Sequence, residues 1–247
     1  ALGDITISDG YELSLRKEGK GSDGPGYSFV VKWKTHTSSS EKASQVPQGW
    51  CSDSLIQKLD EKERSEFDQH CSVYTEKGWW KKVEKDDVEL SEIRRSHPVG
   101  TIFPVKQSLM KSTRIRPVAD MRAANLASPM VSAVQPTVLA AGRVLRGTLR
   151  RGVQVRQYDL EKAFYSIGTE VMDAKTGKCT PVYLRIGKDL FQCSKLAFGL
   201  SVGPHALNCS QRIIQKVARC AYDVLKGAQC RDVFPTIVVV MDDFVVA

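Results

Sequence analysis

The chain has 247 residues, of which 42% are hydrophobic and 26% are charged. These fractions are typical of a folded globular protein and exclude a chain that is disordered throughout. The most apolar run, residues 237–241, is too short to cross a bilayer, so a transmembrane protein is excluded.

The formal net charge of +8 is concentrated in the middle of the chain. Residues 101–160 hold ten basic side chains against only Asp120 and Asp159, a surplus equal to that of the whole protein. Such a concentration suits a polyphosphate partner, namely nucleic acid, nucleotide or an anionic membrane surface. A well-solvated basic face is the alternative, and charge alone does not decide between the two.

Cysteine and histidine usage indicates the compartment. The seven cysteines form no C-x-x-C pair, and residues 1–25 contain no apolar segment typical of a secretory signal. We therefore expect reduced thiols in an intracellular, cytoplasmic protein. The four histidines match no zinc spacing, so we expect no structural zinc.

The first half of the chain divides into two parts. Residues 1–49 are expected to be an irregular segment of unknown role, with short strands at 5–7 and 27–33. Residues 50–97 read as a helical lead-in. A helix capped by Ser52 is predicted to run to Lys77, and a second one covers residues 87–95.

Residues 98–247 alternate between strands and helices. Strands at 101–106 and 116–122 predict a basic β-hairpin, followed by a helix over 136–151 and a strand over 153–160 that runs into a helix starting at Glu161. A hairpin at 182–193, a long helix at 204–225 and a hairpin at 236–247 complete the order. This order predicts an α+β fold with an antiparallel sheet.

Two adjacent carboxylates lie at the tip of the last predicted hairpin. Asp242 and Asp243 separate two apolar runs, and neither supplies the positive φ that a two-residue turn prefers. Adjacent carboxylates repel unless a cation lies between them, and their hard oxygen atoms suit Mg²⁺. A solvated acidic turn is the alternative for this pair when it stands alone.

A third carboxylate strengthens the interpretation of Asp242 and Asp243 as metal ligands. Asp159 closes the strand at 153–160, where by itself an N-cap is the simpler role. A strand-end aspartate, a later Asp-Asp hairpin and an upstream basic hairpin together are what two-metal phosphoryl transfer requires.

Four ordered blocks resemble the reverse transcriptases of LTR retrotransposons and retroviruses. They read RPVADMRAAN at residues 116–125, YDLEKAF at 158–164, LAFGLSVGP at 196–204 and VMDD at 240–243. The resemblance implies a polymerase palm with an antiparallel sheet and helices on one face, plus a fingers β-hairpin, over residues 98–247.

The resemblance also implies a role for each matched position. Two Mg²⁺ ions, or Mn²⁺, would be held by the catalytic carboxylates Asp159, Asp242 and Asp243 with the backbone carbonyl of Leu160. The incoming nucleotide would be bound by Arg116, Lys106 or Lys111, Ala163, Phe164, Phe198 and Gly199. Phe164 would lie under the sugar and exclude a 2′-hydroxyl, and Arg122 would lie against the template.

The sequence departs from the family pattern in three places. Val240 replaces an aromatic residue, Ala197 replaces a proline, and the chain ends four residues after Asp243, so we expect fingers and palm truncated before the thumb. The expected function is an RNA-directed DNA polymerase, part of a retroelement polyprotein, acting on a primed RNA or DNA template and a deoxynucleoside triphosphate, with no membrane partner. A catalytically inactive nucleic-acid-binding remnant and an RNA-dependent RNA polymerase palm are the alternatives.

Overall fold

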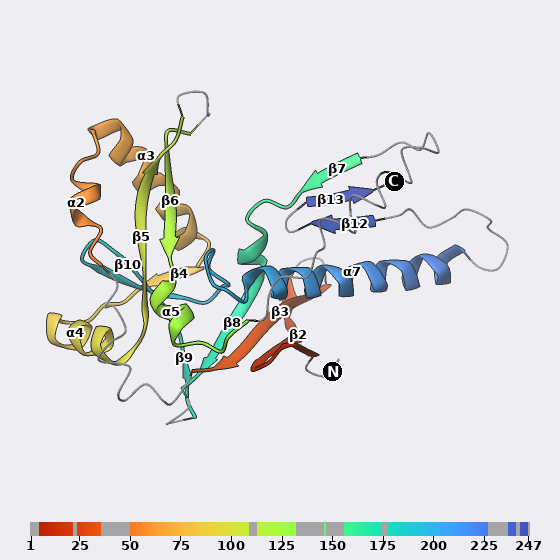
Figure 1. Ribbon diagram of the computed structural model, residues 1–247. Coiled ribbons are helices and arrows are strands. Elements are labelled where there is room, and N and C mark those ends of the chain that lie inside the picture. Colours follow the sequence, from red (N-terminus) through yellow and green to blue (C-terminus); the bar gives the residue numbers. More distant parts are fainter. Residues whose placement is uncertain are drawn as a thin grey trace. The chain divides into compact units, whose positions relative to one another are not determined.

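The computed structural model describes residues 5–21, 24–35, 50–108, 113–131, 146, 156–173, 177–226, 237–240 and 243–246. The fold is α+β, as expected from the order of elements (Figure 1). The chain divides into two compact units. The first consists of Ala1–Val131 with Phe164–Gly203, and the second of Ser132–Ala163 with Pro204–Ala247. These boundaries differ from the divisions at 49/50 and 97/98 that we expected from composition.

One sheet of the first unit carries the basic hairpin. Its strand order is β4 (Trp80–Lys82), β11 (Asp189–Cys193), β10 (Val182–Ile186), β5 (Val99–Lys106) and β6 (Ile115–Asp120). Strands β10 and β5 run parallel, and the other neighbours are antiparallel. The side chains of Ile102, Ile115, Leu184 and Leu190 are almost fully buried, so burial of apolar surface holds this sheet together.

The described part of the first unit also contains four α-helices. They are α2 (Asp53–Ile56), α3 (Glu61–Glu76), α4 (Asp87–Ser96) and α5 (Arg122–Leu126). Leu90 and Ile93 of α4 pack on a buried cluster that includes Val99 and Tyr183.

The expected helix from Ser52 to Lys77 is wrong in one respect, because it breaks between α2 and α3. Asp60 and Glu63 form a capping box that starts α3, while the Ser52 hydroxyl accepts a hydrogen bond from the amide of Gly187 (3.0 Å).

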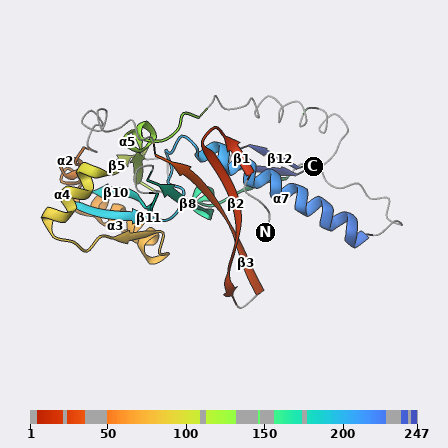
Figure 2. The same ribbon diagram turned by 90° about the horizontal axis from the view of Figure 1, so that it is seen from below.

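The second sheet of the first unit contains the N-terminal residues. Its order is β1 (Ile5–Ser8), β2 (Tyr11–Gly21), β3 (Gly24–Lys34), β8 (Ile167–Met172) and β9 (Cys179–Thr180). Figure 2 shows β2 and β3 as two long neighbouring strands. The expected strands at 5–7 and 27–33 are confirmed. The rest of residues 5–34 differs from the irregular segment that we expected, because Tyr11, Leu13, Val31 and Trp33 bury one face of a long hairpin, whose register shifts between Lys17 and Lys20.

The second unit contains a small antiparallel sheet and a long helix. The sheet has the order β12 (Ile237–Val240), β13 (Asp243–Val246) and β7 (Arg156–Asp159). The predicted hairpin at 236–247 and the helix at 204–225 are confirmed, the latter as α7 (Gly203–Lys226). The expected antiparallel pairing holds throughout this sheet, whereas the other two sheets each contain one parallel pair. Among the described residues, no helix is both long and apolar enough to cross a membrane.

The segment after β7 differs from its prediction. No α-helix starts at Glu161. Instead, a turn leads to the 3₁₀ helix η1 (Ala163–Ser166) and directly into β8. Lys162 adopts a positive φ of 53°, which a right-handed helix does not accept. The helix predicted over 136–151 lies outside the described residues except for Arg146.

Candidate active site

Two of the three residues expected to supply catalytic carboxylates are partners in the register of the small sheet. β7 ends at Asp159 and β13 begins at Asp243, and these residues are direct partners in the antiparallel register (Figure 1). Opposite residues in such a pair share one face of the sheet, with Cα atoms about 4.5–5.5 Å apart. Asp242 lies outside the described residues. Since no α-helix begins between residues 160 and 166, the alternative that Asp159 caps an α-helix is wrong.

The residue that follows Asp159 supplies a backbone carbonyl. The oxygen of Leu160 accepts a long hydrogen bond from the Ala163 amide (3.3 Å), and a carbonyl oxygen has a second lone pair to offer. Carboxylate and carbonyl oxygens are the donors that Mg²⁺ prefers, so the residue types present fit that ion. Among the side chains that the structure describes, no group of three or more His, Cys, Asp or Glu is placed to hold a metal ion.

Two residues that we expect to bind the nucleotide, Phe164 and Phe198, form an aromatic pair in the first unit, which we call the nucleotide corner. Phe164 is buried, Phe198 is 58% exposed, and their ring centroids lie 5.5 Å apart with the planes at 83°. This edge-to-face arrangement is a favourable one for aromatic rings. Gly203 makes room for it, since a Cβ at that position would lie 3.1 Å from Cε1 of Phe164. The structure therefore brings together two of the residues that the sequence assigned to the nucleotide, while Ala163 is buried at the start of η1.

The loop that carries Phe198 is held by an asparagine. The Asn125 side chain donates to the Gly199 carbonyl (2.9 Å) and accepts from the Ser201 amide (2.8 Å), which closes the loop from both sides. Gly199 has a φ of 95°, and a Cβ there would lie 3.1 Å from the Ala119 carbonyl. Sequence reasoning noted Asn125 as part of the first block but assigned it no role, because its partners lie far along the chain.

The basic hairpin β5–β6 presents one paired and one unpaired cation. Lys106 Nζ lies 2.7 Å from both carboxylate oxygens of Glu63 in α3. Arg116, opposite Val105 in the register, is exposed, and its guanidinium makes no hydrogen bond or ion pair with the described residues. Lys111 lies outside the described residues. Of the two assigned cations that the structure describes, Arg116 is thus the one free to bind an anion.

Arg122 belongs to a polar cluster with an aromatic neighbour. It starts α5, where its Nη2 lies 2.6 Å from Oδ2 of Asp120, and Trp50 Nε1 donates to the same oxygen (2.9 Å). The hydrogen bonds from Arg122, with a smaller contribution from Trp50, hold the pKa of Asp120 well below its usual range. The indole of Trp50 also packs against Phe103, with ring centroids 5.0 Å apart. Trp50 was missed at the sequence level, where nothing links it to residues 70 positions away.

Comparisons with known proteins find similarity only among solved structures. Neither the protein-family models nor the curated proteins that were searched match the chain. Among solved structures, it is similar to one described as the foamy viral protease-reverse transcriptase dRH in complex with ds DNA, with a TM-score of 0.46 and 14% identity. The match covers 76% of this chain and 26% of the other, so the chain spans about a quarter of that protein's length.

Proposed function

We propose that the chain is the fingers and palm portion of an RNA-directed DNA polymerase. The observation that carries this proposal is the register of β7 and β13, which sets Asp159 opposite Asp243 although they lie far apart in the sequence. Carboxylates at opposite positions of neighbouring strands repel each other unless a cation is shared between them. A pair of Mg²⁺ ions, held by Asp159, Asp242, Asp243 and the Leu160 carbonyl, fits this donor set. When bound, the metal would activate the primer hydroxyl and neutralise the leaving pyrophosphate.

The first unit would bind the incoming nucleotide. Arg116 is exposed and unpaired among the described residues, so its guanidinium can form two parallel hydrogen bonds with phosphate oxygens. The Phe164 ring would pack under the deoxyribose and exclude a 2′-hydroxyl. Phe198, at right angles to it, would form the second wall of the sugar pocket.

The template is proposed to run over the Arg122 cluster. Arg122 is exposed, and Trp50 and Phe103 place aromatic surface beside it on the same side of β5–β6. Single-stranded nucleic acid is bound by this combination of cations that contact phosphates and rings on which bases stack.

Glu63 is expected to compete with the triphosphate for Lys106. We expect Glu63→Gln to lower the KM for dTTP about two- to fivefold, the range of an exposed ion pair, with kcat unchanged. Glutamine keeps the acceptor for the Asp60 amide, so α3 retains its capping box. Steady-state kinetics of the variant, with Glu61→Gln as a control that removes a neighbouring charge, measure the effect. Equal KM values for the two variants would show that Lys106 does not bind the nucleotide.

Primer extension tests the function itself. The chain, given poly(rA) primed with oligo(dT), dTTP and Mg²⁺, is expected to extend the primer, and chelation of the metal is expected to stop it. Tight binding of the primed template without incorporation would instead support a nucleic-acid-binding protein without catalysis. Incorporation of UTP as efficient as that of dTTP would support an RNA polymerase.

A further inference from the structure

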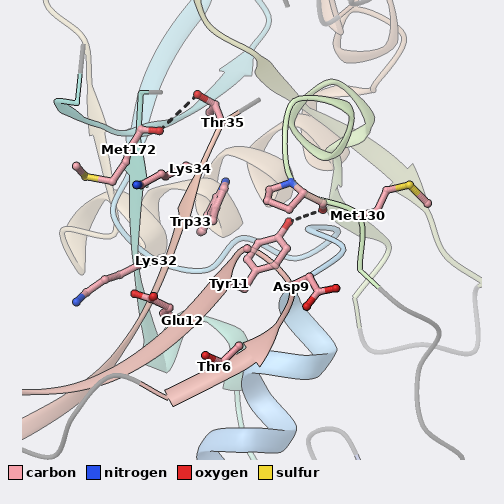
Figure 3. Close-up of a pocket in the computed structure, with 12 residues that line it drawn as sticks. Thr6, Asp9, Tyr11, Glu12, Lys32, Trp33, Lys34, Thr35, Met130 and Met172 are labelled. Atoms are coloured by element: carbon pink, nitrogen blue, oxygen red, sulfur yellow. Dashed lines mark hydrogen bonds between the residues drawn. The ribbon is translucent and has the colours of Figure 1, made fainter. Parts of the chain in front are cut away.

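The turn between β1 and β2 packs against the segment that follows α5. The Tyr11 hydroxyl donates to the Pro129 carbonyl (2.9 Å), and the Tyr11 side chain is 1% exposed (Figure 3). Gly10 has a φ of 78°, and a Cβ there would lie 2.8 Å from Cγ of Pro129. The N-terminal residues are therefore in close contact with the segment that follows α5.

The segment that Tyr11 contacts leads back to the loop that carries Phe198. Pro129 follows α5, and Asn125 of α5 holds residues 199–201 through the Gly199 carbonyl and the Ser201 amide. Burial raises the pKa of Tyr11, and the side chains of Ser201 and Ser128 partly offset that rise. Tyr11 thus supports the segment next to the residue that holds residues 199–201.

The second strand of the N-terminal hairpin holds the strand that follows Phe164. β3 pairs with β8 in parallel over six residue pairs, from Phe29 with Ile167 to Lys34 with Met172. Arg16 forms a two-fold ion pair with Glu170 in the middle of β8. Since β8 follows η1 directly, the pairing fixes the segment whose second residue is Phe164.

We propose that residues 5–34 are a positioning element of the nucleotide corner, with Tyr11 as its main contact. The hairpin holds the two chain segments from which Phe164 and Phe198 project, so it sets the angle and spacing of the two rings. The claim that the hairpin affects nucleotide binding rests on the proposed function. The claim that it braces residues 199–201 does not rest on it.

The variant Tyr11→Phe tests the contact with minimal disturbance. The change removes one hydroxyl and keeps the buried ring, so the variant is expected to fold. We expect the Ser201 amide to exchange its hydrogen about fivefold faster, the factor that corresponds to one ordinary hydrogen bond. The KM for dTTP should rise by a similar factor while kcat changes less, because the pocket is distorted before the chemical step.

Tyr27→Phe is the matched control. Tyr27 lies on β3 of the same hairpin and is 61% exposed, so loss of its hydroxyl should change neither exchange nor KM. Asn125→Ala removes the side chain that binds residues 199–201 directly, and it serves as the comparison for Tyr11→Phe. If both residues act on residues 199–201, the effects of Tyr11→Phe and Asn125→Ala on Ser201 exchange should be non-additive in the double variant.

A second pair of variants tests the packing on Pro129. Gly10→Ala and Gly78→Ala both place alanine at a positive φ, 78° and 67°, but only position 10 has an atom within 4 Å of the new Cβ. We expect faster exchange at Ser201 in Gly10→Ala and no change there in Gly78→Ala, although both should lower the melting temperature.

Three results would separate this inference from the proposed function. Unchanged exchange at Ser201 in both Tyr11→Phe and Gly10→Ala would overturn the bracing role, even if the chain extends primers. If exchange rises as expected, bracing is supported whether or not the chain incorporates dTTP. An active chain whose KM stays constant in Tyr11→Phe would overturn the link to the nucleotide.

Discussion

Replacement of Asp243 by asparagine is expected to lower the rate of dTTP incorporation about a thousandfold at saturating substrate. The change keeps the shape of the side chain but removes the negative charge opposite Asp159. Loss of a metal-binding charge removes several kcal/mol of transition-state stabilisation, and each 1.36 kcal/mol corresponds to a factor of ten. Primer extension on poly(rA) with oligo(dT), followed over a Mg²⁺ titration, measures the rate and the metal requirement together.

Asp189→Asn provides the control for that experiment. Asp189 begins β11, and its carboxylate lies 3.0 Å from Nζ of Lys82 on an exposed part of the first unit. The variant loses the same charge from a strand residue and should keep its polymerase rate. Retention of the wild-type rate in Asp243→Asn, at the same Mg²⁺ concentration, would contradict the two-metal assignment.

Replacement of Phe164 by valine is expected to lower the preference for dTTP over UTP about a hundredfold, mainly by improving the use of UTP. The ring is held edge-to-face against Phe198 and against Gly203, so it has no room to move away from a 2′-hydroxyl. A valine at this position would open that space. The measurement is the ratio of kcat/KM for the two nucleotides on the same primed template.

Phe191→Val separates this effect from a general loss of packing. Phe191 lies in β11 and is 9% exposed, as is Phe164, so the two substitutions remove the same buried apolar surface. Both variants are expected to unfold at lower temperature, and only Phe164→Val should change the nucleotide preference. If the preference falls equally in both, the ring of Phe164 has no specific role at the sugar.

Local sequence patterns were sufficient for the elements whose structure depends on near neighbours. The helix α7 and the hairpins at 182–193 and 236–247 follow from periodicity and turn residues, which act over a few positions. The helix predicted at Glu161 failed because the positive φ of Lys162 and the burial of Phe164 and Tyr165 override local helix propensity.

The same distinction between local pattern and tertiary structure applies to the candidate site. Motif order alone identified the candidate site residues Asp159, Asp243, Phe164, Phe198 and Arg116. Tertiary structure decided which of them meet, because strand register and loop contacts join residues that no local pattern connects. It set Asp159 opposite Asp243, paired Lys106 with Glu63 while leaving Arg116 exposed, and added Trp50 and Asn125.

The N-terminal segment shows the difference most clearly. Its charge is balanced and its composition rich in glycine and serine, so the sequence by itself determined only two short strands there and no role. The parallel pairing of β3 with β8 and the contact of Tyr11 with Pro129 place it in the first unit beside the nucleotide corner. Both contacts span more than a hundred residues, and the free energy of such pairings comes from buried surface that exists only once the chain has folded.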